Sequence, residues 1–131
     1  MDDTIDDACD DACDEEAEQA ERAGGAEEAA GCLVVLCTAP SMEVAVALAR
    51  GAVEAGLAAC VNLIPGVRSF YRWDGAIQDD AESQLILKIR ADRLDALTRW
   101  IIAAHPYETP EVIALPITGG SAAYLDWLRS S

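Results

Sequence analysis

Residues 67–77 read Val-Arg-Ser-Phe-Tyr-Arg-Trp-Asp-Gly-Ala-Ile, and this stretch predicts where the chain reverses direction in the middle of the domain. The pair Asp74-Gly75 lies between two extended segments that contain aromatic and apolar residues. Asp-Gly is typical of the two-residue type I′ turn, in which both turn residues need positive φ, so the pattern predicts a β-hairpin. Just upstream, Pro65-Gly66 predicts a bulge or bend in a long first strand, because proline cannot donate to the strand ladder.

A strand and a helix precede the hairpin. Residues 32–38 form a short, continuous apolar run, which is the pattern of a strand buried on both faces. Ser41 is a good helix N-cap, apolar residues follow it at helical spacing, and Gly56 ends the pattern. The first half of the domain is therefore predicted as β-α-β.

A second such half follows the hairpin. Residues 85–90 alternate between core and surface positions, as expected of a strand with one buried face. Asp92 is predicted to cap a helix that ends before Pro106, residues 112–117 are predicted as a last β segment, and Ser121 begins a terminal helix. The order β-α-β-β-α-β describes an α+β fold, the ferredoxin-like sandwich, here with an extra C-terminal helix.

The net charge of −15 is concentrated at the N-terminus, where residues 1–31 hold 13 acidic residues against the single base Arg22. Such a like-charged segment with little apolar bulk is typical of disorder. We therefore predict an acidic disordered tail over residues 1–31 and a folded domain over residues 32–131. No nucleic-acid partner is expected, because that binding needs clustered Lys and Arg and Lys88 is the only lysine.

Other features of the sequence bear on where the protein works. No apolar run reaches the ~18 residues of a membrane span, so no membrane partner is expected. The chain opens with acidic residues, whereas a secretory signal opens with basic ones. Five cysteines, an odd number, favour reduced thiols over a disulfide framework. Together these features predict a cytoplasmic protein.

The sequence offers few groups for catalysis, and we predict that the protein is not an enzyme. It contains neither a G-x-S-x-G nucleophile motif nor a P-loop. Cys37 and His105 are expected to approach each other near one end of the sheet, and thiolate and imidazole ligands suit copper or zinc. Two alternatives stay open: Cys37 is a small core residue, and His105 is a helix C-terminal cap.

Four stretches follow one another along the chain. They read Val-Val-Leu-Cys-Thr-Ala-Pro (34–40), Gly-Leu-Ala-Ala-Cys-Val-Asn-Leu-Ile-Pro-Gly-Val-Arg-Ser (56–69), Tyr-Arg-Trp-Asp-Gly (71–75) and His-Pro-Tyr-Glu-Thr-Pro-Glu (105–111). In order and spacing these stretches resemble the CutA family of divalent-cation tolerance proteins. The resemblance runs from about Leu33 to Leu128 and leaves the acidic tail without a counterpart.

The resemblance implies a ferredoxin-like homotrimer, similar in shape to the PII signalling proteins and associated with tolerance to copper and other divalent ions. It implies no catalytic reaction. In some family members copper is assigned to a strand cysteine that matches Cys37 and to two adjacent histidines, of which the second matches His105. Ala104 stands at the first histidine position, and two ligands hold a divalent ion less well than three, so weak binding is expected.

Three functions therefore follow as hypotheses. The leading one is a cytoplasmic homotrimer that binds or senses a divalent cation such as copper through Cys37 and His105. The rivals are a PII-like module that binds a small molecule in a cleft between subunits, and a trimeric scaffold for partner proteins. Aromatic residues and a few charges are typical of ligand pockets, although aromatic residues also fill subunit interfaces. The candidate cleft or interface residues are Arg68, Tyr71, Trp73, Lys88, Tyr107 and Glu108.

Overall fold

The computed structural model describes residues 31–131, and the first strand begins at Cys32. The acidic tail predicted for residues 1–31 therefore lies, apart from its last residue, outside the described part of the chain. Within residues 31–131, no helix is long and apolar enough to cross a membrane.

The elements follow the predicted order. They are β1 (Cys32–Ala39), α4 (Met42–Glu54), β2 (Cys60–Trp73), β3 (Ala76–Arg90), a 3-10 turn (Ala91–Arg93), α5 (Leu94–Ala104), β4 (Ile113–Pro116) and α6 (Ala122–Ser130). The four strands form one sheet in the order β2-β3-β1-β4, and each neighbouring pair is antiparallel. This is the α+β ferredoxin-like arrangement with an extra C-terminal helix, as the sequence predicts.

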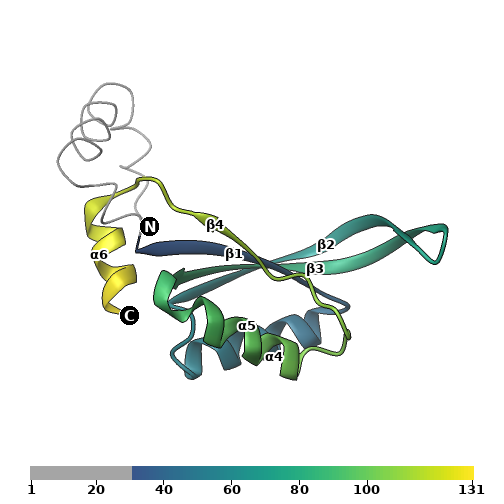
Figure 1. The fold of residues 1–131 in the computed structure, drawn as a ribbon, viewed down its shortest axis with the longest axis horizontal. Helices are drawn as coiled ribbons and strands as arrows, with labels where there is room; N and C mark the ends of the chain where they lie inside the picture. The colour runs from purple at the N-terminus through teal and green to yellow at the C-terminus, as the bar shows by residue number, and fades with distance from the viewer. Residues whose placement is uncertain (1–30) are drawn as a thin grey trace.

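Figure 1 shows how these elements are layered. Helices α4 and α5 lie side by side along one face of the sheet, and the β2–β3 hairpin extends beyond them at one end. Helix α6 lies at the opposite end. Strands β2 and β4 are the two edges of the sheet. Among the described residues, 31–131, no helix covers most of the face turned away from α4 and α5.

The hairpin forms where its turn residues predict it. Asp74 and Gly75 both have positive φ, 50° and 76°, as a type I′ turn requires, and Trp73 pairs with Ala76 across it. Between Ile64 and Val67 the pairing of β2 with β3 shifts register. The predicted bulge is therefore confirmed, and β2 is one long strand with an irregularity in the middle.

The helix ends agree with the sequence in α4 but not at the start of α5. The Ser41 hydroxyl accepts the N–H of Val44 at 3.2 Å, which confirms the predicted N-cap. Asp92 does not cap α5, because a 3-10 turn intervenes and no side chain caps the helix at Arg93. The Asp92 carboxylate accepts two hydrogen bonds from Arg90 instead, at 2.9 and 2.5 Å. This charge-assisted, bidentate pair competes with capping.

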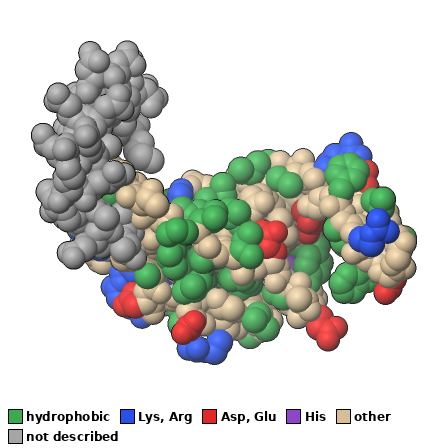
Figure 2. Space-filling model, turned by 45° about the horizontal axis from the view of Figure 1, so that its top comes forward, with side chains coloured by type: hydrophobic (Ala, Val, Ile, Leu, Met, Phe, Trp, Pro, Cys, Tyr) green, Lys and Arg blue, Asp and Glu red, His purple; other side chains and the backbone are tan. Residues whose placement is uncertain are grey.

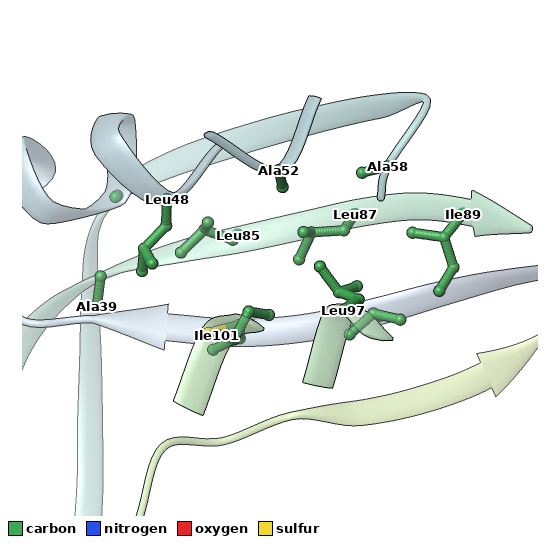
Figure 3. Packing of buried hydrophobic residues seen from close by; sticks show 12 residues of the cluster. Ala39, Leu48, Ala52, Ala58, Leu85, Leu87, Ile89, Leu97 and Ile101 are labelled. Carbon is green, nitrogen blue, oxygen red and sulfur yellow. The ribbon is translucent and has the colours of Figure 1, made fainter. Parts of the chain in front are cut away.

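The hydrophobic core lies between the sheet and the two helices (Figure 3). Leu85, Leu87 and Ile89 of β3 point toward the helices and meet Leu48 of α4 and Leu97 of α5. All five of these side chains are at most 3% exposed. The alternating residues on the opposite sheet face include Val34 and Ile86, which stay partly exposed. Every second residue of the strand therefore faces the core, and helices of the same chain cover that core.

Candidate functional site

The loop that follows α5 carries His105, which joins the helix layer to β1. His105 is the C-cap of α5, and its N–H donates to the Ile101 carbonyl at 2.8 Å. Its ring Nδ1 accepts the N–H of Tyr107 at 3.0 Å, and its Nε2 lies 2.7 Å from the Thr38 carbonyl oxygen. Because Nδ1 accepts, Nε2 carries the proton and donates to Thr38, so the ring is the neutral tautomer. Both ring nitrogens are engaged within the fold.

Cys37 lies beside this histidine at the same carbonyl. Its Sγ donates to the Thr38 oxygen at 3.6 Å, and the residue is fully buried. Burial raises the pKa of the Cys37 thiol to about 12, and the negative charges of Glu111 and Glu82 add to the shift. At neutral pH the thiol is therefore protonated, and a metal ion would have to displace that proton.

Tyr107 continues the hydrogen-bonded chain from His105 to β3. The two rings lie 4.8 Å apart between centroids, and the Tyr107 hydroxyl donates to Oε2 of Glu82 at 2.8 Å. Glu82 is 9% exposed, so this carboxylate lies almost inside the protein. Burial and the hydrogen bond to Glu82 both raise the pKa of Tyr107, so the hydroxyl keeps its proton. Thr38, His105, Tyr107 and Glu82 thus connect β1, the loop and β3.

A pocket of about 770 Å³ opens between this loop and the outer part of the hairpin. Its walls combine aromatic rings from β2 and the loop with carboxylates from β3 and the loop. The lining residues are Thr38, Ser69, Phe70, Tyr71, Trp73, Glu82, Pro106, Tyr107, Glu108, Thr109 and Glu111. Figure 2 shows acidic side chains beside the hollow that separates the hairpin from the body of the molecule.

The structure brings together four of the six residues that the sequence suggested for a cleft or interface. Tyr71, Trp73, Tyr107 and Glu108 all line the pocket. The hydroxyl of Tyr71 donates to the Asp80 carboxylate, and this bond raises the pKa of Tyr71.

The other two suggested residues lie elsewhere. Arg68 pairs with Asp79, with its Nη2 at 2.5 Å from Oδ2, and its guanidinium stacks over the ring of Phe70. Lys88 binds the side-chain oxygen of Asn62 and lies 4.0 Å from Sγ of Cys60. Both bases are held by neighbours on strands, and neither lines the pocket.

Sequence reasoning missed Glu82 and Glu111 as pocket residues. The period of two through Leu85 and Leu87 assigns Glu82 to the sheet face away from the helices, where a carboxylate is normally exposed. The loop after α5 crosses to that face, and Tyr107 covers Glu82 there. The sequence does place Tyr107, Glu108 and Glu111 in one loop, which is a signal for a polar site. It does not indicate which strand this loop contacts.

Fold and site together define a ferredoxin-like domain with a pocket between its extended hairpin and the loop after α5. The family model for the CutA1 divalent ion tolerance protein matches residues 33–131. The chain therefore belongs to this family. Cys37 and His105, which the sequence suggested as metal ligands, meet at the Thr38 carbonyl, and residues 31–131 contain no group of three or more His, Cys, Asp or Glu arranged to hold a metal ion.

Two curated relatives illustrate the match. The chain is 48% identical over 98 residues to the divalent-cation tolerance protein CutA of Thermus thermophilus, covering 75% of this chain and 95% of that protein. It is 50% identical over 99 residues to the chloroplastic protein CutA of Arabidopsis thaliana, covering 76% of this chain and 54% of that one. The chain thus spans about half the length of this plant relative.

A solved structure agrees with the fold. The crystal structure of CutA1 from Oryza sativa superposes with a TM-score of 0.76 at 48% identity, covering 79% of this chain and 94% of the rice chain. Similarity at this level extends across the whole described domain.

Proposed function

We propose that this chain acts in divalent-cation tolerance as a homotrimer that binds or senses a divalent ion such as copper, without catalysing a reaction. The observation that carries the metal part is the convergence of two soft donors on one point. Cys37 Sγ and His105 Nε2 lie 3.6 and 2.7 Å from the same Thr38 oxygen. Thiolate and imidazole are the ligand types that copper selects.

The geometry also supports a modest affinity for copper. Copper must displace the thiol proton of Cys37, whose pKa is about 12, and the hydrogen bond that His105 donates to Thr38. Ala104, exposed at the end of α5, supplies no third ligand. Two donors with these costs support modest affinity, which suits a protein that releases its ion.

Copper titration of the full-length protein tests this site, on a background in which Cys9 and Cys13 of the acidic segment are replaced by serine. We expect Cys37→Ser and His105→Ala each to lower the copper affinity, and Ala104→His to raise it by adding a ligand beside His105. Cys60→Ser, at a thiol on another strand, is the matched control. If both single variants bind copper like the parent, Cys37 is only a core residue and His105 only a helix cap.

The trimer is supported by surface that one copy leaves uncovered. Within the part of the chain that the structure describes, each edge strand, β2 and β4, has one unpaired side, and such edges can pair with another chain. Phe70, Trp73 and Ile77 on the hairpin are 62–69% exposed. Figure 2 shows a broad hydrophobic area over the sheet face that α4 and α5 do not cover. Sedimentation at micromolar concentration is expected to give about three times the chain mass of 13.9 kDa.

A second candidate function is a module that binds a small molecule, and the pocket between the hairpin and the loop after α5 favours it. Its volume of about 770 Å³ lies within the range of ligand sites, and its aromatic walls carry a few polar groups. A thermal-shift panel of metals and metabolites separates the candidates, because a ligand of the native state raises the melting temperature.

The remaining parts of the proposal are a location in the cytoplasm and, as a third candidate, a scaffold for partner proteins. Cys32, Cys37 and Cys60 are free thiols, which supports a reducing compartment. The exposed hairpin supports a scaffold only if it stays uncovered in the trimer. Co-sedimentation with cell extract proteins before and after Trp73→Asp tests that candidate.

A further inference from the structure

The pocket between the hairpin and the loop after α5 has a charge pattern that the copper proposal does not use. Four aromatic rings contribute to its wall: Phe70, Tyr71, Trp73 and Tyr107. Three carboxylates line the same space: Glu82, Glu108 and Glu111. Within the described residues its lining includes no Lys or Arg, and Arg68, which stacks over Phe70, is paired with Asp79. An aromatic pocket with this one-sided charge selects for a cation and against an anion.

The three carboxylates can attract an organic cation, but they are not arranged to coordinate a metal ion. A divalent metal needs several ligands at roughly 2.0–2.6 Å from one point. Residues 31–131 contain no group of three or more His, Cys, Asp or Glu arranged to hold one. Oε2 of Glu82 already accepts the hydroxyl of Tyr107. The three carboxylates therefore supply a negative field around the pocket without a coordination cage.

Aromatic faces supply the second half of the recognition. Ring faces attract ammonium groups through their quadrupole, and an ammonium that carries alkyl groups also buries apolar surface. We propose that this pocket binds a small organic ammonium cation, held by the rings of Tyr71, Trp73 and Tyr107 and by the field of the three glutamates. This inference rests on the small-molecule candidate above and is independent of the Cys37–His105 pair.

Calorimetry on the full-length protein tests the proposal with three probes: choline, its neutral isostere 3,3-dimethylbutan-1-ol, and AMP as an anion of ligand size. We expect choline to bind and the neutral isostere to bind at least about tenfold more weakly. AMP is expected not to bind. The three probes separate a preference for cations from a general capacity of the pocket for small molecules.

Two pocket variants and two matched controls locate the site. Glu108→Gln and Trp73→Leu are each expected to weaken choline binding by at least about fivefold. Glu43→Gln, at the exposed start of α4, and Trp127→Leu, on α6, make the same chemical changes outside the pocket and are expected to bind like the parent. If Trp73→Leu alters the sedimentation mass, Glu108→Gln at an exposed loop position decides alone.

The outcomes are distinguishable. Equal binding of choline and its isostere, or unchanged binding in Glu108→Gln, overturns the ammonium proposal. Binding of AMP alone overturns it as well and leaves a small-molecule function standing. Absence of binding by all three probes overturns the ammonium proposal, whereas the small-molecule candidate is tested separately by the thermal-shift panel of metabolites.

Discussion

On the sheet face toward α4 and α5, Leu85, Leu87 and Ile89 are at most 1% exposed, whereas on the opposite face Ile113 and Leu115 are 52% and 48% exposed. Both faces belong to the same four strands, and both are rich in branched apolar residues. Within residues 31–131, two helices cover one face, whereas α6 at one end and the loop after α5 cover only parts of the other. Alternating residues of the same strands therefore serve two purposes: one set stabilises the single copy, and the other is available for the association between copies proposed above.

Shortening a side chain on the covered face is expected to have the largest effect. Leu87→Ala removes a fully shielded side chain from the core and is expected to lower the free energy of unfolding by about 2–5 kcal/mol. Ile86→Ala, its neighbour on the uncovered face, is the matched variant and loses less in one copy. Chemical denaturation at two protein concentrations measures both. Only the Ile86 loss is expected to depend on concentration, because in the proposed trimer only that residue would be shielded by a second copy.

Placing a charge on the uncovered face tests the other side of the comparison. Leu115→Asp on the edge strand β4 is expected to break the trimer while leaving the circular dichroism spectrum unchanged, because interface cores are depleted of charge. Ile102→Asp, on α5 and 52% exposed, makes the same change away from the sheet and keeps the trimer mass. A trimer that survives Leu115→Asp would show that this face is not the interface.

Close packing within the helix layer predicts a smaller effect. A Cβ added at Gly51 of α4 would meet atoms Cζ2 and Cη2 of Trp100 at 2.6 and 2.8 Å. Overpacking costs about 1–3 kcal/mol, and replacing glycine by alanine in a helix returns about 1 kcal/mol, so Gly51→Ala is expected to destabilise by about 1 kcal/mol. Gly119→Ala, with no atom within 4 Å, is the control for thermal melting. A stabilised Gly51→Ala would mean that the indole moves away freely.

The smallest expected effect is a change in how stability depends on pH. The pKa of Cys37 rises from an ordinary value of 9.0 to about 12 in the folded protein. Between these values the unfolded chain releases the thiol proton and the folded chain keeps it, so the free energy of unfolding falls as pH rises. Cys37→Ala is expected to flatten this slope in melts between pH 8 and 9.5. Val35→Ala shortens a core residue without a titrating group and is expected to keep the parent slope.

The sequence by itself determined the order of elements and most of their ends. Asp74-Gly75 placed the hairpin because few residues adopt two successive positive φ angles, and Ser41 placed the start of α4 because its hydroxyl satisfies a free N–H. The period of two through Leu85 and Leu87 identified the core face. Where two local interactions competed, as at Asp92, sequence alone chose the wrong partner.

The composition of the candidate site depends on contacts between segments that lie far apart in the sequence. Cys37 and His105 are 68 residues apart and meet only because β1 and the end of α5 converge on the carbonyl of Thr38. Glu82 became a buried pocket residue because the loop after α5 laid Tyr107 over it. Arg68 and Lys88 do not line the pocket, because each is paired with a residue on the adjacent strand: Arg68 with Asp79, and Lys88 with Asn62. Local patterns are fixed by backbone geometry over a few residues, whereas a site depends on which distant segments pack together.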